Sequence, residues 1–253
     1  MTTATFEFHG ELNRFLAPAQ RGRRCPHTCP PGASVKHMIE ALGVPHTEVD
    51  SILVNGAGAE FSRPVAPGDR VEVFPHGASL GSARHVPLRP PHSARFVADA
   101  HLGRLARNLR MLGIDVLYRN DYGDADLARL AATEDRIVLT RDRDLLIRKE
   151  IVHGCFVHAT GSDAQLAQVL RRFDLAPLLR PFSRCLVCNH PLRGIARAAV
   201  RHQVPPRSYA AHERFYECRC CGRVYWEGSH VERMRRRLAH LLGAHDAGLP
   251  DAT

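Results

Sequence analysis

The sequence predicts an α/β protein made of three successive parts: a small N-terminal domain, a parallel α/β core and a C-terminal zinc module. Short apolar strands alternate with amphipathic helices, and several strands are followed by an aspartate. A stretch rich in Gly, Ser and Pro precedes the core, and two Cys-x-x-Cys pairs follow it. The expected boundaries are a first domain at 1–76, a linker at 77–93, the core at 94–180, the zinc module with a basic helix at 181–242, and a flexible tail at 243–253.

Composition narrows the class of protein. With 253 residues, 44% of them hydrophobic, the chain can bury the cores of two or three domains. No apolar run approaches the roughly 18 residues of a membrane span, and the N-terminus lacks the features of a signal peptide. We therefore expect a cytoplasmic protein without a membrane partner. The formal net charge is +9, and it rises from −1 over residues 1–80 to +8 over residues 181–240, as expected if the last part meets phosphates.

The N-terminal part is expected to form an independent domain that contains both strands and a helix. Alternation predicts a strand at 5–8, with a second strand near Phe15. A helix with an apolar face follows, and Ser34 and Gly43 are typical of its two ends. Two later strands, at 52–54 and 71–74, are expected after it, with an Asn-Gly turn following the first of them.

A loop rich in cysteine and arginine, RGRRCPHTCPPG, precedes that helix. Cys25, His27 and Cys29 could bind a metal or form a redox pair, but these three residues leave a tetrahedral site incomplete. The alternative is a flexible basic loop.

In the core, three aspartates lie at junctions between strands and helices. Asp99 and Asp142 each follow a short apolar strand, and Asp124 opens a helix after another strand. Because parallel strands bring their carboxyl ends to one edge of a sheet, we expect these carboxylates to converge. Asp144 is a fourth candidate, whereas Asp115 precedes its strand and belongs at the opposite edge.

Converging carboxylates repel one another unless a cation binds among them. Oxygen ligands suit Mg²⁺ or Mn²⁺, which can activate water and neutralise the charge on a phosphodiester. The alternative is that these residues only cap helices, because Asp124 and Asp142 stand where an N-cap would.

The helix after Asp99 carries leucines on one stripe and arginines on another. Arg107 and Arg110 are candidates for contacting a phosphate backbone or the acidic cluster, since arginine suits bidentate phosphate recognition. A solvated basic face is the alternative.

The C-terminal module contains two Cys-x-x-Cys pairs, Cys185 with Cys188 and Cys218 with Cys221, separated by 29 residues. Two such pairs complete a Cys₄ tetrahedron around Zn²⁺, and a closed tetrahedron serves a structural role. Cys220 is not expected to be a ligand.

Aromatic and basic side chains follow the second cysteine pair. Tyr225 and Trp226 could stack on unpaired bases while Arg223 holds the backbone. For Trp226 the alternative is that it covers the small core of the zinc module.

Taken together, four motifs resemble the Mut-seven C-terminal RNase family, PIN-like nucleases with a zinc ribbon after the core. They are FVADAHLGRLARNLRMLGIDV, GDADLARLA, RIVLTRDRDLL and CRCCGRVYWEGSH. The resemblance implies a three-layer α/β/α core with a parallel sheet and a Cys₄ zinc ribbon. It implies that the catalytic metal is bound by Asp99, Asp124 and Asp142. It also implies that Asp144 is an additional acid, that the Thr140 hydroxyl supports the acidic site and that His230 lies near it.

The N-terminal segment is similar to β-grasp (ubiquitin-like) domains related to sulfur carriers, through its V-N-G and P-G-D-R-V-E-V-F-P signatures. Sulfur carriers need a free Gly-Gly end, but this segment continues through Pro75, His76 and Gly77 into more chain. Docking to a protein partner or contacting RNA is therefore expected in place of sulfur transfer.

The sequence thus predicts a metal-dependent ribonuclease that uses Mg²⁺ or Mn²⁺ for catalysis and Zn²⁺ for structure, with single-stranded RNA as its expected partner. One alternative is a non-catalytic RNA-binding adaptor that uses the ribbon and the arginine-rich surface. A sulfur-transfer partner is a further alternative.

Overall fold

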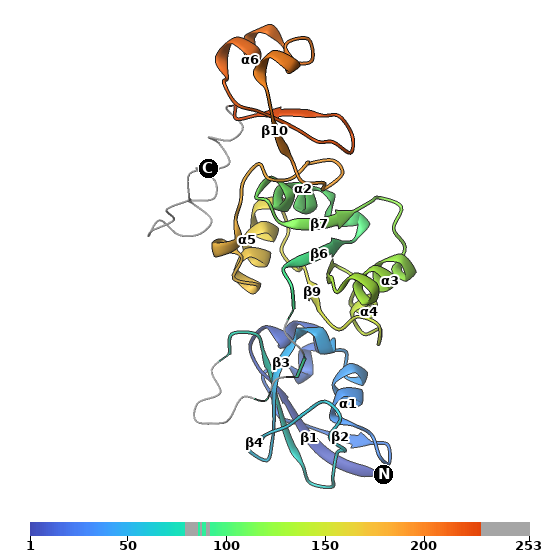
Figure 1. Cartoon of the computed structure of the whole chain (residues 1–253). Helices are drawn as coiled ribbons and strands as arrows, with labels where there is room; N and C mark the ends of the chain where they lie inside the picture. Colours follow the sequence, from blue (N-terminus) through green and yellow to red (C-terminus); the bar gives the residue numbers. More distant parts are fainter. Residues whose placement is uncertain (79–85, 87, 90–91, 229–253) are drawn as a thin grey trace. The chain divides into compact units, whose positions relative to one another are not determined.

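The structure is a computed structural model that describes residues 1–78, 86, 88–89 and 92–228 (Figure 1). It divides into two compact units, one made of Met1–Ser93 with Asp124–Phe156 and the other of Ala94–Gly123 with Val157–Thr253. The predictions for His230, the basic helix and the tail fall outside the described residues. Over the part of the chain that is described, no helix is long and apolar enough to cross a membrane.

The N-terminal domain is a mixed five-stranded sheet in the order β2-β1-β5-β3-β4 with one α-helix, which is the arrangement of a β-grasp domain. β1 pairs antiparallel with β2 and parallel with β5. The strands are β1 (Thr2–Phe8), β2 (Cys25–Cys29), β3 (Val49–Val54), β4 (Ala57–Gly58) and β5 (Arg70–Pro75), and the helices are α1 (Val35–Ala41) and the short 3₁₀ helices η1 (Gly10–Phe15), η2 (Pro18–Gln20) and η3 (His46–Glu48).

Local sequence explains these elements. Alternate residues of β1 are buried, so Phe6 and Phe8 face the core. α1 begins where the Ser34 hydroxyl accepts the N–H of His37 at 3.2 Å, and it is followed by Gly43 at φ +92°. The Asn-Gly turn after β3 also has positive φ at both residues, as a tight hairpin requires.

Two expectations for this domain are wrong. Phe15 ends a 3₁₀ helix and does not lie in a strand, because the Asn13 amide donates to the carbonyl of Phe8 at 2.7 Å and stabilises a turn there. The segment with Cys25 and Cys29 is the strand β2 and not a flexible loop, since β1 pairs along its whole length.

The first unit also contains half of the α/β core: α3 (Asp124–Glu134), β8 (Ile137–Thr140), α4 (Arg143–Leu146) and β9 (Gly154–Phe156), with β8 and β9 parallel. The β-grasp domain packs against β9 through buried polar contacts. The Glu48 carboxylate accepts the N–H of Phe156 at 2.7 Å, and a ring nitrogen of His46 lies 2.9 Å from the carbonyl of Ile151.

The second unit begins with the other half of the core. β6 (Arg95–Ala98) and β7 (Asp115–Tyr118) are parallel, connected by η4 (Ala100–Leu102) and α2 (Gly103–Met111). α2 buries its leucine stripe, and α5 (Ser162–Arg172) packs near it. The parallel strands and their connecting helices confirm the α/β fold class of the core.

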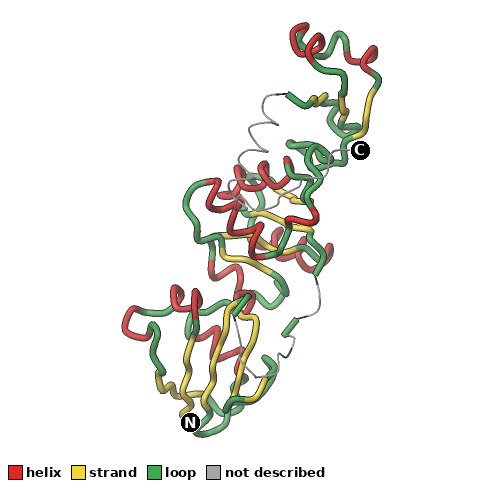
Figure 2. Tube along the Cα trace, turned by 90° about the vertical axis from the view of Figure 1, so that its left-hand side faces the viewer, coloured by secondary structure: helices red, strands yellow, loops and turns green. Residues whose placement is uncertain are grey.

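The rest of the second unit is a three-stranded antiparallel ribbon in the order β10-β11-β12. Its small core contains Val200, Val204 and Phe215. Between β10 and β11 the chain forms helical turns outside this sheet (Figure 2). The elements after α5 are η5 (Ala176–Leu178), β10 (Arg193–Ile195), η6 (Arg197–Val200), α6 (Pro206–Ala211), β11 (Phe215–Glu217) and β12 (Val224–Trp226).

Candidate functional site

The four predicted zinc ligands come together. Their sulfur atoms all lie within 4.8 Å of one another, with Cys185 3.6 Å from Cys221 and Cys188 3.4 Å from Cys218. A Zn–S bond of about 2.3 Å places the sulfurs of a tetrahedron about 3.8 Å apart, so this donor set fits Zn²⁺. Cys220 is exposed and lies outside the group, as expected.

The surroundings of the thiols shift the pKa values of Cys185 and Cys188 in opposite directions. Burial opposes ionisation of Cys185, yet backbone N–H groups at Cys188 and Val187 and the Tyr225 hydroxyl, 3.0 Å from Sγ, lower its pKa to about 6. Burial raises the pKa of the Cys188 thiol. A cation ligated by both sulfurs would have to displace at least one proton, so its affinity would depend on pH.

The two aromatic residues of β12 contact other residues of the ribbon. The Tyr225 hydroxyl is used at Cys185, and Trp226 is half-buried against the ribbon core, with its ring 6.4 Å from that of Phe215. Trp226 thus follows the alternative interpretation, in which it covers the core. Arg223 is exposed, and the hydrogen bond that its guanidinium donates to Cys221 raises its pKa. RNA contacts by Arg223 and Tyr225 stay predictions.

Arg110 is buried in the structure, whereas it was predicted to contact a phosphate backbone or the acidic cluster. Its side chain is only 4% exposed, and its guanidinium donates to the carbonyls of Val116 at 2.8 Å and of Leu186 and Val187 at 3.3 and 2.7 Å. A guanidinium bound to three carbonyls inside the protein is not offered to a phosphate, so the predicted nucleic-acid contact is wrong for this residue. Arg107 lies on the same helix and is exposed, and its predicted role stays open.

Asp142 is held at the end of β8 by hydrogen bonds of its backbone and of its side chain. Its backbone N–H donates to Oγ1 of Thr140 at 2.9 Å, and Thr140 is fully buried. Its Oδ1 accepts the N–H groups of Asp144 and Leu145 at 2.8 and 3.4 Å, which makes it the N-cap of α4. The capping interpretation is therefore confirmed for Asp142. Both bonds use Oδ1, and Oδ2 could act as a ligand to a cation.

The other two candidate acids of the first unit lie on the surface. Asp124 is the first residue of α3 and is exposed, where the helix dipole favours its negative charge. Asp144 is 80% exposed and pairs with Arg143 at 3.4 Å. Among the described residues, Asp124, Asp142 and Asp144 do not form a group with oxygens within 4.8 Å of one another.

Asp99, in the second unit, directly follows β6 and precedes η4. Its carbonyl accepts the N–H of Leu102 at 2.9 Å. The hydroxyl of Tyr118, the last residue of β7, donates to the carbonyl of Ala100 at 3.0 Å and supports the same turn. Asp115 lies at the other end of β7, as expected, where it contacts Asn189 and Arg184.

A second cluster of possible ligands was not predicted. Glu7 and Glu72 lie opposite each other on β1 and β5, and His9 follows β1 directly. The donor atoms of these three residues lie within 4.8 Å of one another. Arg24 already contacts both carboxylates. Because the arginine supplies the positive charge, this cluster does not need a metal ion.

Comparison with known proteins identifies two families. The family model described as "Mut7-C RNAse domain" matches residues 94–238, and the one described as "Mut7-C ubiquitin" matches residues 1–80. No curated protein and no solved structure matches the chain.

Proposed function

The chain belongs to the Mut7-C RNAse domain family, and from this premise we propose that it is a metal-dependent ribonuclease. In this proposal Asp99, Asp124 and Asp142 hold Mg²⁺ or Mn²⁺, and Asp144 is an additional acid near them. When bound, such a cation supplies an activated water and neutralises charge on the phosphodiester.

The observation that carries the proposal is the way in which Asp142 is held. Thr140 is buried and anchors the backbone N–H of Asp142, while two N–H groups at the start of α4 hold Oδ1. The carboxylate is thereby fixed at the carboxyl end of a parallel strand, and its second oxygen, Oδ2, takes no part in these hydrogen bonds. Catalytic groups require this kind of preorganisation, because a loosely held ligand positions its cation poorly.

The arrangement of the other acids supports the same chemistry. Asp99 follows the parallel strand β6, and Asp124 begins the helix after the parallel strand β7. Strand ends of this kind are where α/β sheets place ligands. Neither residue is needed for the core, since both lie outside the buried apolar cluster.

RNA binding is proposed for the ribbon. Its arginines are spread over the sheet and over the helical segment between the cysteine pairs, and exposed guanidinium groups bind phosphates by charge and by bidentate hydrogen bonds. The exposed arginines in the described part of the ribbon are Arg193, Arg201, Arg207, Arg214, Arg219 and Arg223. Single-stranded RNA is the proposed substrate, and the ubiquitin-like domain is a candidate surface for a protein partner.

A second candidate is a non-catalytic RNA-binding adaptor. It is favoured by the observation that capping α4 already accounts for the Asp142 carboxylate. The adaptor predicts RNA affinity without strand cleavage, and this affinity should survive removal of Mg²⁺.

The deciding experiment is cleavage of end-labelled single-stranded RNA and DNA by zinc-loaded protein with Mn²⁺ or Mg²⁺. The test variant is Asp142→Asn, because asparagine is also a good N-cap and preserves the start of α4 while removing the charge. The control is Asp121→Asn, an aspartate whose side chain is 60% exposed and pairs with Arg119 on the surface.

A ribonuclease with this site loses cleavage in Asp142→Asn and keeps it in Asp121→Asn. Equal traces of cleavage in all three proteins would mean contamination, and binding of RNA without cleavage in any of them would support the adaptor. Cleavage of DNA alone would contradict RNA as the substrate.

A further inference from the structure

The buried guanidinium of Arg110 joins three segments of the second unit. The residue itself lies near the end of α2, Val116 lies in β7, and the other two carbonyls belong to the residues between the ligands of the first cysteine pair. One side chain therefore connects the α/β core to the loop that folds around the proposed zinc ion.

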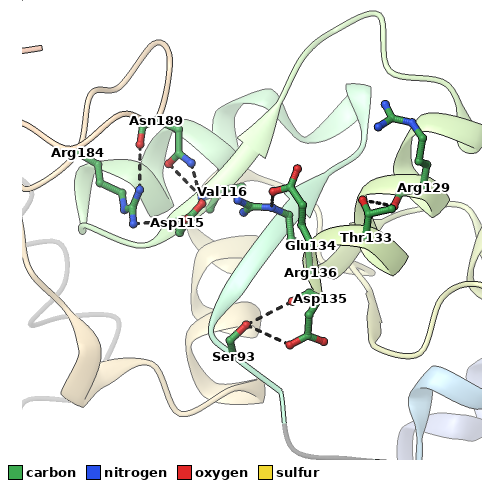
Figure 3. A network of polar contacts seen from close by, with 10 residues as sticks. All are labelled: Ser93, Asp115, Val116, Arg129, Thr133, Glu134, Asp135, Arg136, Arg184 and Asn189. Carbon is green, nitrogen blue, oxygen red and sulfur yellow. Dashed lines mark hydrogen bonds and ion pairs between the residues drawn. The ribbon is translucent and has the colours of Figure 1, made fainter. Parts of the chain in front are cut away.

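Asn189 makes a second connection. It follows Cys188 and is 5% exposed, with a positive φ of +66° that asparagine tolerates. Its Oδ1 accepts the N–H of Val116 at 3.1 Å, and its Nδ2 donates to Oδ1 of Asp115 at 2.7 Å (Figure 3). The amide side chain thus satisfies the backbone N–H of Val116 in β7, as a carbonyl of a neighbouring strand would.

Arg184, which precedes the first ligand, makes a third connection. Its guanidinium lies 3.2 Å from the Asp115 carboxylate and donates to the carbonyl of Asn189 at 3.0 Å (Figure 3). It also donates to the carbonyl of Gly113 at 3.2 Å. The residues on both sides of the first cysteine pair therefore hold the start of β7.

β7 in turn supports the turn that carries Asp99. It pairs in parallel with β6, from Arg95 opposite Asp115 to Ala98 opposite Tyr118. At the far end of β7 the Tyr118 hydroxyl bonds to the carbonyl of Ala100, and a Cβ atom at Gly103 would lie only 2.6 Å from that hydroxyl. This close packing couples the position of β7 to the backbone after Asp99.

We infer that the first cysteine pair is a clamp on the α/β core, through which zinc binding fixes β7 and the turn after Asp99, with Arg110 as the positioning residue. The role of the zinc module then extends beyond holding nucleic acid. The part of this inference that concerns Asp99 rests on the proposed function, while the clamp itself does not.

The clamp makes a prediction about zinc retention. Arg110→Met would leave the carbonyls of Val116, Leu186 and Val187 without their donor, so the loop between the ligands would lose its support. Changes to groups that support metal ligands typically weaken metal affinity about 10- to 100-fold. Arg110→Lys keeps the positive charge near the thiolates but cannot reach all three carbonyls, so it should also lose zinc.

The test uses the full-length, zinc-loaded protein. Zinc release to a chromogenic chelator is measured for the wild type, Arg110→Met, Arg110→Lys and Arg104→Met, which removes an exposed arginine of the same helix. Amide hydrogen exchange over residues 113–118 is measured before and after zinc is stripped from the wild type.

The clamp predicts zinc release at least tenfold easier in both Arg110 variants, no change in Arg104→Met, and faster exchange over residues 113–118 in the stripped wild type. Unchanged exchange on stripping would overturn it, even if an Arg110 variant failed to fold. Zinc retention by Arg110→Lys equal to that of the wild type would also overturn it, because charge alone would then be sufficient. Neither zinc release nor hydrogen exchange depends on RNA cleavage. If both results support the clamp but the protein does not cleave RNA, only the proposed ribonuclease function is contradicted.

Discussion

Gly113 tests how tightly the segment before the zinc module packs on the end of α2. It has φ +86°, and a Cβ atom there would lie 2.1 Å from the carbonyl oxygen of Arg180 and 2.6 Å from Oγ of Ser183. Gly161 has the same φ of +86°, but a Cβ atom there meets nothing within 4 Å. Alanine at either position therefore has the same backbone strain, and only Gly113→Ala adds a collision.

The size of the difference follows from the contacts that must move. Alanine at positive φ costs about 1–2 kcal/mol at both positions. In Gly113→Ala the Arg180 carbonyl must also shift, and it accepts both the N–H and the hydroxyl of Ser183, at 3.2 and 2.6 Å. Loss of two hydrogen bonds at about 1 kcal/mol each brings the expected cost to about 3–4 kcal/mol.

The assay is denaturant unfolding followed by fluorescence of Trp226, which is the single tryptophan of the chain and lies in the same unit as both glycines. Gly113→Ala should unfold at clearly lower denaturant than Gly161→Ala, with a difference of about 2 kcal/mol in the free energy of unfolding. Equal destabilisation by the two variants would refute the packing described here.

Three further predictions concern other parts of the chain. The Arg63 guanidinium, followed by the N–H of Ala66 and the Asn55 amide, holds the pKa of Asp69 below its usual value, so the charged form stabilises the fold above about pH 4 and this stabilisation is lost as pH falls through the lowered pKa. Asp69→Asn should therefore cost about 2 kcal/mol at neutral pH in thermal melts and progressively less in acid; a pH-independent cost would contradict this. Thr140→Val removes the acceptor for the N–H of Asp142 and should lower RNA cleavage with little change in RNA affinity, whereas an equal loss of both would point to general unfolding. Cys218→Ser should abolish stoichiometric zinc binding and shift Trp226 emission to the red, and full zinc content in this variant would show that the four cysteines are not the ligands.

Much of the local structure could be predicted from the sequence, because it depends on neighbouring residues. The cap at Ser34, the Asn-Gly turn and the leucine stripe of α2 all follow from side-chain chemistry and periodicity. The cysteine spacing likewise predicted that the four thiols of the two pairs come together, as the ligands of a zinc ion must.

Predictions that needed a distant partner were less accurate. The strand at Cys25–Cys29 exists because β1 lies alongside it, and the cysteine-rich segment carries no signal of that pairing. Arg110 has the helical spacing of a solvated arginine, because periodicity describes one helix and not the segments that pack on it.

By itself, the sequence determined the α/β class, the four cysteines that come together and the position of each candidate acid at a strand or helix end. Only the tertiary structure decided the role of Arg110, whose carbonyl partner at Leu186 is 76 residues away in the chain, and that of Asn189, 73 residues from Val116. The physical reason is that burial and hydrogen-bond satisfaction are properties of contacts between segments, so a basic or amide side chain has no assigned partner until the chain has folded.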